Sequence, residues 1–105
     1  MTIAYIAHPI GGDVNANVLD LLRIIRKINL TQPNVIPYCP YLSDVLALRD
    51  HIPAERKRGL ANGRAMVVKA DQLWLTGSRI SNGMEGEVAI AAANNIPVIN
   101  KINQL

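Results

Sequence analysis

The sequence predicts an α/β fold, a small doubly wound, Rossmann-like or flavodoxin-like, mostly parallel sheet of about four strands with helices on both faces. Short apolar runs of strand length alternate with helical segments along the chain. Such alternation indicates parallel strands joined by right-handed crossovers. The length of 105 residues is that of one ordinary domain, so we expect residues 1–105 to form a single domain.

The first half of the chain contains two expected strands and one long helix. An apolar run at residues 2–7 stops at His8 and Pro9 and predicts the first strand. A helix should follow from Asp13, whose side chain can cap it, to about residue 30. A second strand is expected at residues 34–38, where Pro37 ends it or places it at an edge. The helix has apolar residues at helical spacing, namely Val14, Val18, Leu21, Leu22, Ile25 and Ile28.

The second half continues the alternation. Residues 41–52 contain a short helix that Ser43 could cap, and Pro53 opens a longer helix over residues 54–70. Gly59 and Gly63 each cost that helix about 1 kcal/mol relative to alanine. This cost suggests close packing, either on the sheet or against a second subunit. A third strand is expected at residues 72–76, a loop at 77–83, a helix at 84–94 and a fourth strand at 97–100.

Composition narrows the possible functions. The single cysteine, Cys39, cannot form an internal disulfide and has no evident base beside it, which favours a buried thiol over a nucleophile. No apolar run approaches the roughly 20 residues of a membrane helix, and no signal-like segment opens the chain, so we expect a cytoplasmic protein of a bacterial cell or infected host. The net charge of +3 with no Phe argues against a nucleic-acid polymer as the partner. The basic run around Arg56 is either a solvated face or a phosphate clamp.

The expected ligand site follows from topology. With strand order 2-1-3-4, the crevice lies at the carboxyl ends of strands one and three. Residues 8–13 and 76–87 should therefore face each other, and both segments are rich in Gly and small polar residues that suit an anion. Neither a dinucleotide fingerprint nor a Walker loop is present. His8 has no metal ligand at suitable spacing, so we expect no metal and no cofactor, and His8 makes either a turn contact or a ligand hydrogen bond.

Two carboxylates follow the third strand. If Asn82 caps the helix, Glu85 falls at its third position and can complete a capping box. Glu87 lies about 200° around the helix from Glu85, so only one of them can face the crevice. A carboxylate in that position could accept ribose hydroxyls or attack an anomeric carbon. Trp74 lies in an apolar strand and is either part of the core or a donor to the crevice.

Two motifs resemble the nucleoside 2-deoxyribosyltransferase superfamily. The segment Tyr5 to Pro9 resembles its Tyr-x-Ala-x-Pro opening, and residues 83–91 resemble its catalytic-glutamate helix. A closer similarity is to a family of small phage and prophage proteins of unassigned function. Their spaced pattern is present here as Gly12, Asp13, Pro53, Arg56, Gly59, Leu60, Asp71, Trp74, Gly77, Ser81, Gly83, Met84 and Glu87.

The resemblance implies a nucleoside 2-deoxyribosyltransferase-like domain and a set of site residues. It implies that Glu87, rather than Glu85, is the catalytic carboxylate, and that Tyr5 positions it. It also implies a homo-oligomer, because those enzymes complete their pockets with a neighbouring subunit. The expected ligand-binding residues are His8, Pro9, Gly11, Gly12, Asp13, Arg56, Trp74, Gly77, Ser78, Arg79, Ser81, Gly83 and Met84.

Two functions are compatible with these residues. The leading expectation is binding of a nucleotide or ADP-ribose-like small molecule without turnover, which in a phage protein would sequester a host immune nucleotide signal and serve immune evasion. Binding is preferred over catalysis because the chain is shorter than the characterised transferases and lacks a counterpart of their base-recognising aspartate. The alternative is a nucleoside or nucleotide N-glycosidase or deoxyribosyltransferase that uses Glu87 as the nucleophile.

Overall fold

A computed structural model describes all residues, 1–105, and confirms the predicted fold class. Four parallel strands form one sheet in the order β2-β1-β3-β4. The strands are β1 (Thr2–Ala7), β2 (Val35–Tyr38), β3 (Gln72–Leu75) and β4 (Val98–Asn100). The helices are α1 (Val14–Thr31), α2 (Leu42–Ala47), α3 (Pro53–Val67) and α4 (Asn82–Ala93).

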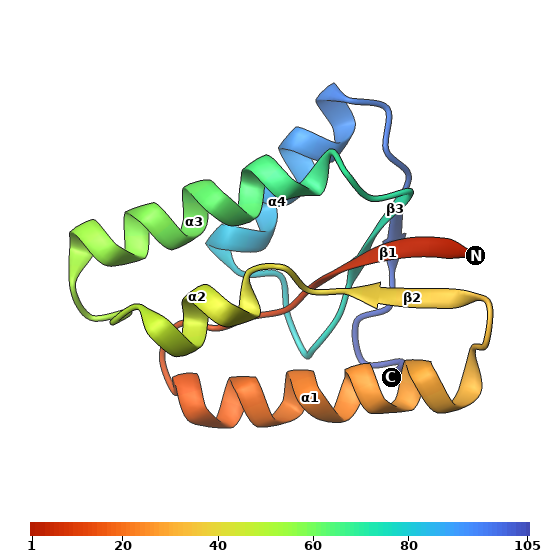
Figure 1. Ribbon diagram of the computed structural model, residues 1–105, viewed down its shortest axis with the longest axis horizontal. Coiled ribbons are helices and arrows are strands. Elements are labelled where there is room, and N and C mark those ends of the chain that lie inside the picture. Colours follow the sequence, from red (N-terminus) through yellow and green to blue (C-terminus); the bar gives the residue numbers. More distant parts are fainter.

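The helices form layers on the two faces of the sheet. Helix α1 covers one face, whereas α3 and α4 lie side by side over the other (Figure 1). The chain therefore changes faces between β1, which leads into α1, and β3, which leads into α4. This is the topological switch point at which ligands bind in open α/β sheets.

The core lies along the two central strands. The last four residues of β1 and the last three of β3 are buried, as expected for parallel strands covered on both faces. Helix α1 contributes Leu21, Ile24 and Ile28 to this core. Leu22, which the sequence pattern placed on the buried stripe, is 45% exposed. The inward face is centred one residue away from it, on Leu21 and Ile24.

The helix starts follow the local sequence, with two corrections. Asp13 caps α1 by accepting a hydrogen bond from the Ala16 N–H at 3.1 Å, as expected. Ser43 does not cap α2, because it lies inside that helix, which starts after Tyr41 without a side-chain cap. Asn82 is likewise not the cap of α4. Ser81 is the cap, and its hydroxyl accepts the Met84 N–H at 3.3 Å.

The cap at Ser81 also changes the role expected for Glu85. Met84, not Glu85, occupies the third position of α4, and its sulfur accepts the Ser81 N–H at 3.4 Å. Glu85 is therefore exposed without a capping role. Helix α3 begins at Pro53 as predicted and ends at Val67, three residues before the predicted end.

The two glycines of α3 make their close contacts within the chain. A Cβ on Gly63 would lie 3.2 Å from the Tyr5 hydroxyl, and a Cβ on Gly59 would lie 3.5 Å from Leu48 Cδ1. Their spacing thus reflects intramolecular packing of α3 on β1 and α2. None of the helices combines the length and the apolar character needed to cross a membrane.

Candidate functional site

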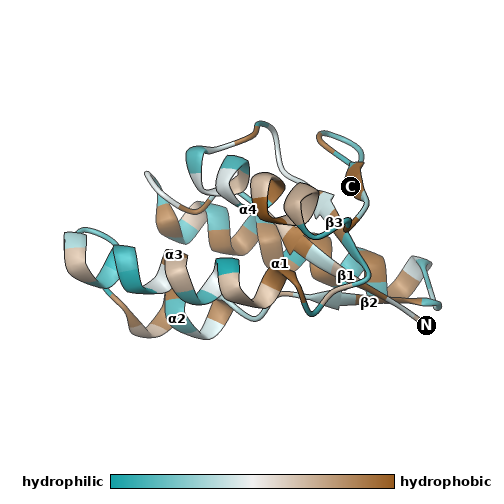
Figure 2. Cartoon of the chain, turned by 90° about the horizontal axis from the view of Figure 1, so that it is seen from above, coloured by the Kyte–Doolittle hydropathy of each residue, from teal (hydrophilic) through white to brown (hydrophobic).

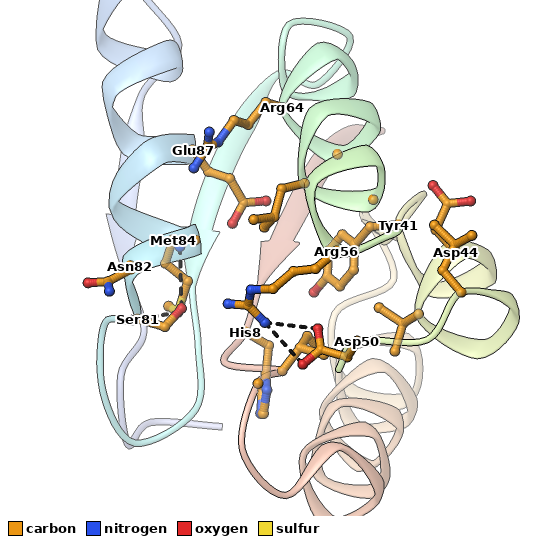
Figure 3. A pocket seen from close by; sticks show the side chains of 18 of the residues that line it. His8, Tyr41, Asp44, Asp50, Arg56, Arg64, Ser81, Asn82, Met84 and Glu87 are labelled. Carbon is orange, nitrogen blue, oxygen red and sulfur yellow. Dashed lines mark hydrogen bonds and ion pairs between the residues drawn. The ribbon is translucent and has the colours of Figure 1, made fainter. Parts of the chain in front are cut away.

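A pocket lies at the switch point between β1 and β3. It has a volume of about 230 Å³ and is open to solvent. The segment after β1 forms one wall, and the segment from Arg79 to Glu87 forms the opposite wall (Figure 3). Helices α2 and α3 supply a third wall. The two segments expected to face each other therefore do so across a real cavity.

Most of the predicted site residues line this pocket. Tyr5 and Glu87, which are distant in sequence, lie on the same cavity. The pocket thus brings together the tyrosine and the glutamate that the sequence singled out as a pair. The other predicted residues on the pocket wall are His8, Gly11, Arg56, Arg79, Ser81, Gly83 and Met84.

Six of the predicted residues do not line the pocket, and Trp74 is the clearest case. It is 4% exposed, and its indole N–H donates to the Gln72 side chain at 2.9 Å. The Lys101 ammonium lies 5.1 Å from its ring centroid. Trp74 is therefore part of the core and of the β3–β4 side of the sheet. The other five residues outside the pocket are Pro9, Gly12, Asp13, Gly77 and Ser78.

Glycines among these residues shape the loops instead. Gly12 and Gly77 have positive φ angles of 91° and 85°, a conformation that glycine adopts without strain. A Cβ on Gly77 would also lie 2.9 Å from Pro9 Cδ and 3.2 Å from His8 Nε2. The loops after β1 and β3 therefore approach each other closely only because residue 77 lacks a side chain.

Apart from Arg56, the wall formed by α2 and α3 was not predicted as part of the site. Strand order predicts which loops meet at the switch point, but not that the α2–α3 unit folds over them. The four-residue spacing of Gly59 and Gly63 was the available signal, since Gly63 lets α3 approach Tyr5. The unpredicted lining residues are Ile10, Tyr41, Asp44, Val45, Leu48, Asp50, Glu55, Gly59, Leu60, Gly63, Arg64 and Asn82.

Glu87 is an unusual carboxyl group in this cavity. Burial raises its pKa from 4.5 to about 7, and the Tyr5 hydroxyl and the Arg64 guanidinium offset part of that rise. Figure 3 shows its carboxylate pointing into the cavity from α4. Perturbed acids in pockets are typical of functional sites. At neutral pH both the acid and the carboxylate forms of Glu87 are accessible.

Tyr5 is fixed beside Glu87 at the floor of the pocket. Its ring is fully buried, and its hydroxyl donates to the Gly63 carbonyl at 3.3 Å. Burial, and then the nearby Glu87, raise the pKa of the Tyr5 phenol well above its usual value. Tyr5 therefore keeps its proton and can act only as a neutral hydrogen-bond donor or acceptor.

Arg56 lies at the pocket mouth. Its Nη1 atom contacts both oxygens of Asp50, at 2.8 and 3.0 Å (Figure 3). A Cβ on Gly11 would lie 3.0 Å from the same nitrogen, so the guanidinium rests on the backbone after β1. Arg56 thus links the α2–α3 connection to the loop after β1. Its remaining N–H groups are available to an anionic ligand.

His8 lines the pocket, but both of its ring nitrogens already have partners. Nδ1 lies 2.6 Å from the Pro9 carbonyl and Nε2 lies 2.8 Å from Asp20. The hydrogen bond between His8 and Asp20 lowers the pKa of Asp20, and the contacts of Asp20 with Arg23 lower it further. A ligand hydrogen bond from the ring would require one of these contacts to break. The turn contact foreseen as one role of His8 is the role present here.

Cys39 is a buried thiol near the site. Burial raises the pKa of the Cys39 thiol to about 12, so the thiol is protonated and unreactive at neutral pH. No group of three His, Cys, Asp or Glu side chains is arranged to hold a metal ion. The groups that line the pocket and can contact a ligand include Glu87, the pocket arginines and the free N–H groups at the start of α4.

The fold is shared with a known class of α/β proteins. The chain has the nucleoside deoxyribosyltransferase-like α/β fold. Among solved structures it is similar to the 2-deoxyribosyltransferase of the psychrotolerant bacterium Bacillus psychrosaccharolyticus, with a TM-score of 0.60 and 14% sequence identity. The match covers 98% of this chain and 75% of that chain. At this identity the similarity establishes the fold alone.

The family follows from the sequence itself. Residues 2–101 match a family model described as a domain of unknown function, DUF7768, and the chain belongs to this family. None of the curated proteins is similar enough in sequence to match.

Proposed function

We propose that the pocket binds a nucleotide, with the ribose hydroxyls against Glu87 and Tyr5 and the phosphate toward the arginines of the mouth. The observation that carries this proposal is the placement of Tyr5 and Glu87 on one cavity beside Arg56 and Arg79. A carboxylate accepts hydrogen bonds from sugar hydroxyls, and guanidinium groups bind phosphate oxygens. The 2-deoxyribosyltransferase with the same fold acts on nucleosides, which agrees with a ligand of this class.

The size of the pocket favours a mononucleotide over a larger ligand. Its volume of about 230 Å³ lies below the range of about 300–1,000 Å³ that is usual for sites enclosing drug-sized ligands. A nucleoside or mononucleotide can place most of its surface there. An ADP-ribose-like molecule would have to extend through the open mouth past Arg56. Binding without turnover would suit sequestration of a nucleotide signal in an infected host cell.

A second candidate is cleavage or transfer of an N-glycosidic bond by Glu87. The observation that favours it is the burial of Glu87 next to Tyr5, because a desolvated carboxylate held in place is a suitable nucleophile for an anomeric carbon. In that reaction the Glu87 carboxylate forms a bond to C1′ as the bond to the base breaks. The base takes up a proton, and water or another base then releases the sugar.

One experiment separates the two candidates. Nucleosides, nucleoside monophosphates and ADP-ribose are incubated with the native protein, with Glu87→Gln and with Glu85→Gln. Glu85→Gln is the matched control because it removes the same charge two residues away, at an exposed position. Ligand recovered intact after heat denaturation supports binding. Free base that disappears in Glu87→Gln but not in Glu85→Gln supports catalysis. The proposal would be contradicted if the protein neither bound nor converted any of these compounds.

We further propose that the chain forms a homo-oligomer. Leu19, Leu22 and Leu30 are each exposed, and all three lie on one side of α1 at helical spacing. Exposed apolar groups gathered on one helix are suited to contact another copy. Sedimentation velocity at several concentrations tests this, and a monomer at every concentration would contradict it.

A further inference from the structure

Arg64 is a cationic side chain in the pocket that the protein leaves unpaired. It lines the same cavity as Glu87, yet its guanidinium makes no hydrogen bond and no ion pair with the protein. Its Nε atom is buried and lacks any partner. A buried N–H without an acceptor costs free energy, so the position of this group calls for an explanation.

Gly86 provides the seat in which the guanidinium lies. A Cβ at residue 86 would be 2.5 Å from Arg64 Nη2, 2.6 Å from Nε and 2.7 Å from Cζ. The planar end of Arg64 is therefore packed against the backbone of α4, where only glycine leaves room. Gly86 has an ordinary helical conformation, so its small size, and not its backbone freedom, is what this contact requires.

Gly86, against which the Arg64 guanidinium packs, is next to Glu87 in the sequence and in space. Gly86 immediately precedes Glu87 on α4, and Figure 3 shows Arg64 reaching from α3 toward that helix. The charged or titratable groups that act on Glu87 or are acted on by it come from three elements around it. They are Tyr5 of β1, Cys39 and Tyr41 of the β2–α2 connection, and Arg64 of α3.

We propose that Arg64 is a positioning residue that favours the ionised form of Glu87 in the pocket, and that Gly86 is the seat that places its guanidinium. Of the groups around Glu87, Arg64 is the only one that carries a positive charge. Tyr5 and Tyr41 are buried phenols and Cys39 is a buried thiol, so at neutral pH all three are neutral. The opposite charge of Arg64 offsets part of the burial that raises the pKa of Glu87.

This inference deepens the proposed function and rests on it for its biological meaning. The carboxylate form of Glu87 accepts ribose hydroxyls at both oxygens, and only this form can act as a nucleophile. The placement of Arg64 nevertheless can be tested without any ligand. Failure of nucleotide binding would therefore leave this inference standing, and failure of this inference would leave nucleotide binding open.

The test is a titration of Glu87 by NMR in protein labelled with ¹³C at the glutamate carboxyl groups. The chain has three glutamates, and Glu87→Gln identifies the signal of interest. Arg64→Met should move the Glu87 midpoint upward by about one pH unit or more, because the nearby opposite charge is lost. Arg64→Lys should restore much of the native midpoint. Arg58→Met is the matched control, since Arg58 is an exposed arginine of the same helix outside the pocket.

Gly86→Ala tests the seat separately from the charge. The new methyl group would displace the flexible end of Arg64 while leaving the positive charge on the chain, and alanine is well suited to a helix. We expect a folded protein with the Glu87 midpoint raised. Gly59→Ala is the control, because its methyl group meets Leu48 Cδ1 at an ordinary 3.5 Å.

The Glu87 midpoint measured in each variant either supports or overturns part of the inference. A raised midpoint in Arg64→Met and Gly86→Ala, with native midpoints in both controls, supports the inference. An unchanged midpoint in Arg64→Met overturns it. A raised midpoint in Arg64→Met with a native one in Gly86→Ala overturns the role of Gly86. Should Arg64→Met fail to give a folded amide spectrum, Arg64→Gln replaces it, and an unchanged Glu87 midpoint in that variant overturns the inference.

Discussion

Single residues in this pocket have roles set by their surroundings more than by their chemical type. Two glutamates lie two positions apart on α4, yet Glu85 is exposed while Glu87 enters the cavity. The helical rotation between them was predictable from sequence, and so was the conclusion that only one could face the ligand. The elevated pKa of Glu87 was not predictable, because it depends on burial, which tertiary packing produces.

The pKa of Glu87 predicts a pH-dependent cost to stability. Its folded pKa of about 7 lies above the ordinary value of 4.5, so the folded state binds the proton more tightly than the unfolded state. The associated stability is present below pH 4.5 and is lost as the pH rises through about 7. Glu87→Gln should therefore raise the free energy of unfolding at pH 8 by about 3 kcal/mol. Urea denaturation at pH 4 and at pH 8 measures this effect.

The control for that prediction is Glu85→Gln, which should change the unfolding free energy little at either pH. Because glutamine resembles the protonated acid, the benefit of Glu87→Gln should largely disappear at pH 4. Equal stabilisation at both pH values would show that the gain has another cause than the charge of Glu87.

At the scale of elements, glycine and capping residues decide how closely the helices approach the site. Gly63 brings α3 onto Tyr5, and Ser81 starts α4 at the edge of the pocket. The sequence indicated that Gly59 and Gly63 mark a close contact, but it left open whether the partner was the sheet or another subunit. Spacing alone could not resolve this, because the same small face suits either surface.

Gly63→Ala should destabilise the protein despite the higher helix propensity of alanine. Its Cβ would lie 3.2 Å from the hydroxyl of Tyr5, a fully buried ring that cannot withdraw. Overpacking of this kind costs about 1–3 kcal/mol. Gly59→Ala, a substitution in the same helix, places its methyl group 3.5 Å from Leu48 Cδ1 and should be neutral or stabilising. Thermal unfolding of both variants checks the difference, and equal midpoints would contradict the packing argument.

In the structure Asp13 is the N-terminal cap of α1. Because its carboxylate accepts the Ala16 N–H and lies outside the pocket, Asp13→Ala should lower the free energy of unfolding by about 1 kcal/mol. Asp13→Asn should retain most of the native stability, since asparagine caps helices well. Denaturant unfolding measures the loss, and nucleotide affinity should stay at the native level in both variants. A loss of affinity with native stability would assign Asp13 to the ligand instead.

For the whole molecule, the alternation of strands and helices predicted a parallel, doubly wound sheet, whereas the strand order was taken from the common orders of such sheets. The two walls of the pocket after β1 and β3 follow from that order. The third wall does not, because α2 and α3 reach the site through tertiary packing. Tyr41 illustrates this, since its hydroxyl donates to the Ile6 carbonyl at 2.6 Å and so attaches the start of α2 to the central strand. Its sequence neighbourhood contains no comparable signal.

This shared central strand predicts that the chain unfolds in one step. Helix α1 packs on one face of the sheet and α3 on the other, and both depend on β1, so neither layer can persist when β1 detaches. Trp74 is the single tryptophan and is buried in β3, so its fluorescence reports on the sheet, while far-ultraviolet circular dichroism reports mainly on the helices. The exposed N-terminal half of α3 is hydrophilic and contributes little to this core (Figure 2).

The urea midpoints of the two signals should therefore coincide, as expected for a single domain over residues 1–105. A helix signal lost well before the tryptophan signal would show that α3 or α4 unfolds as a separate unit. Repeating the titration at two protein concentrations adds the test of self-association, because a homo-oligomer that must dissociate to unfold has a midpoint that rises with concentration. A midpoint independent of concentration would show that folding is complete within one chain, and that any assembly contributes only weakly to stability.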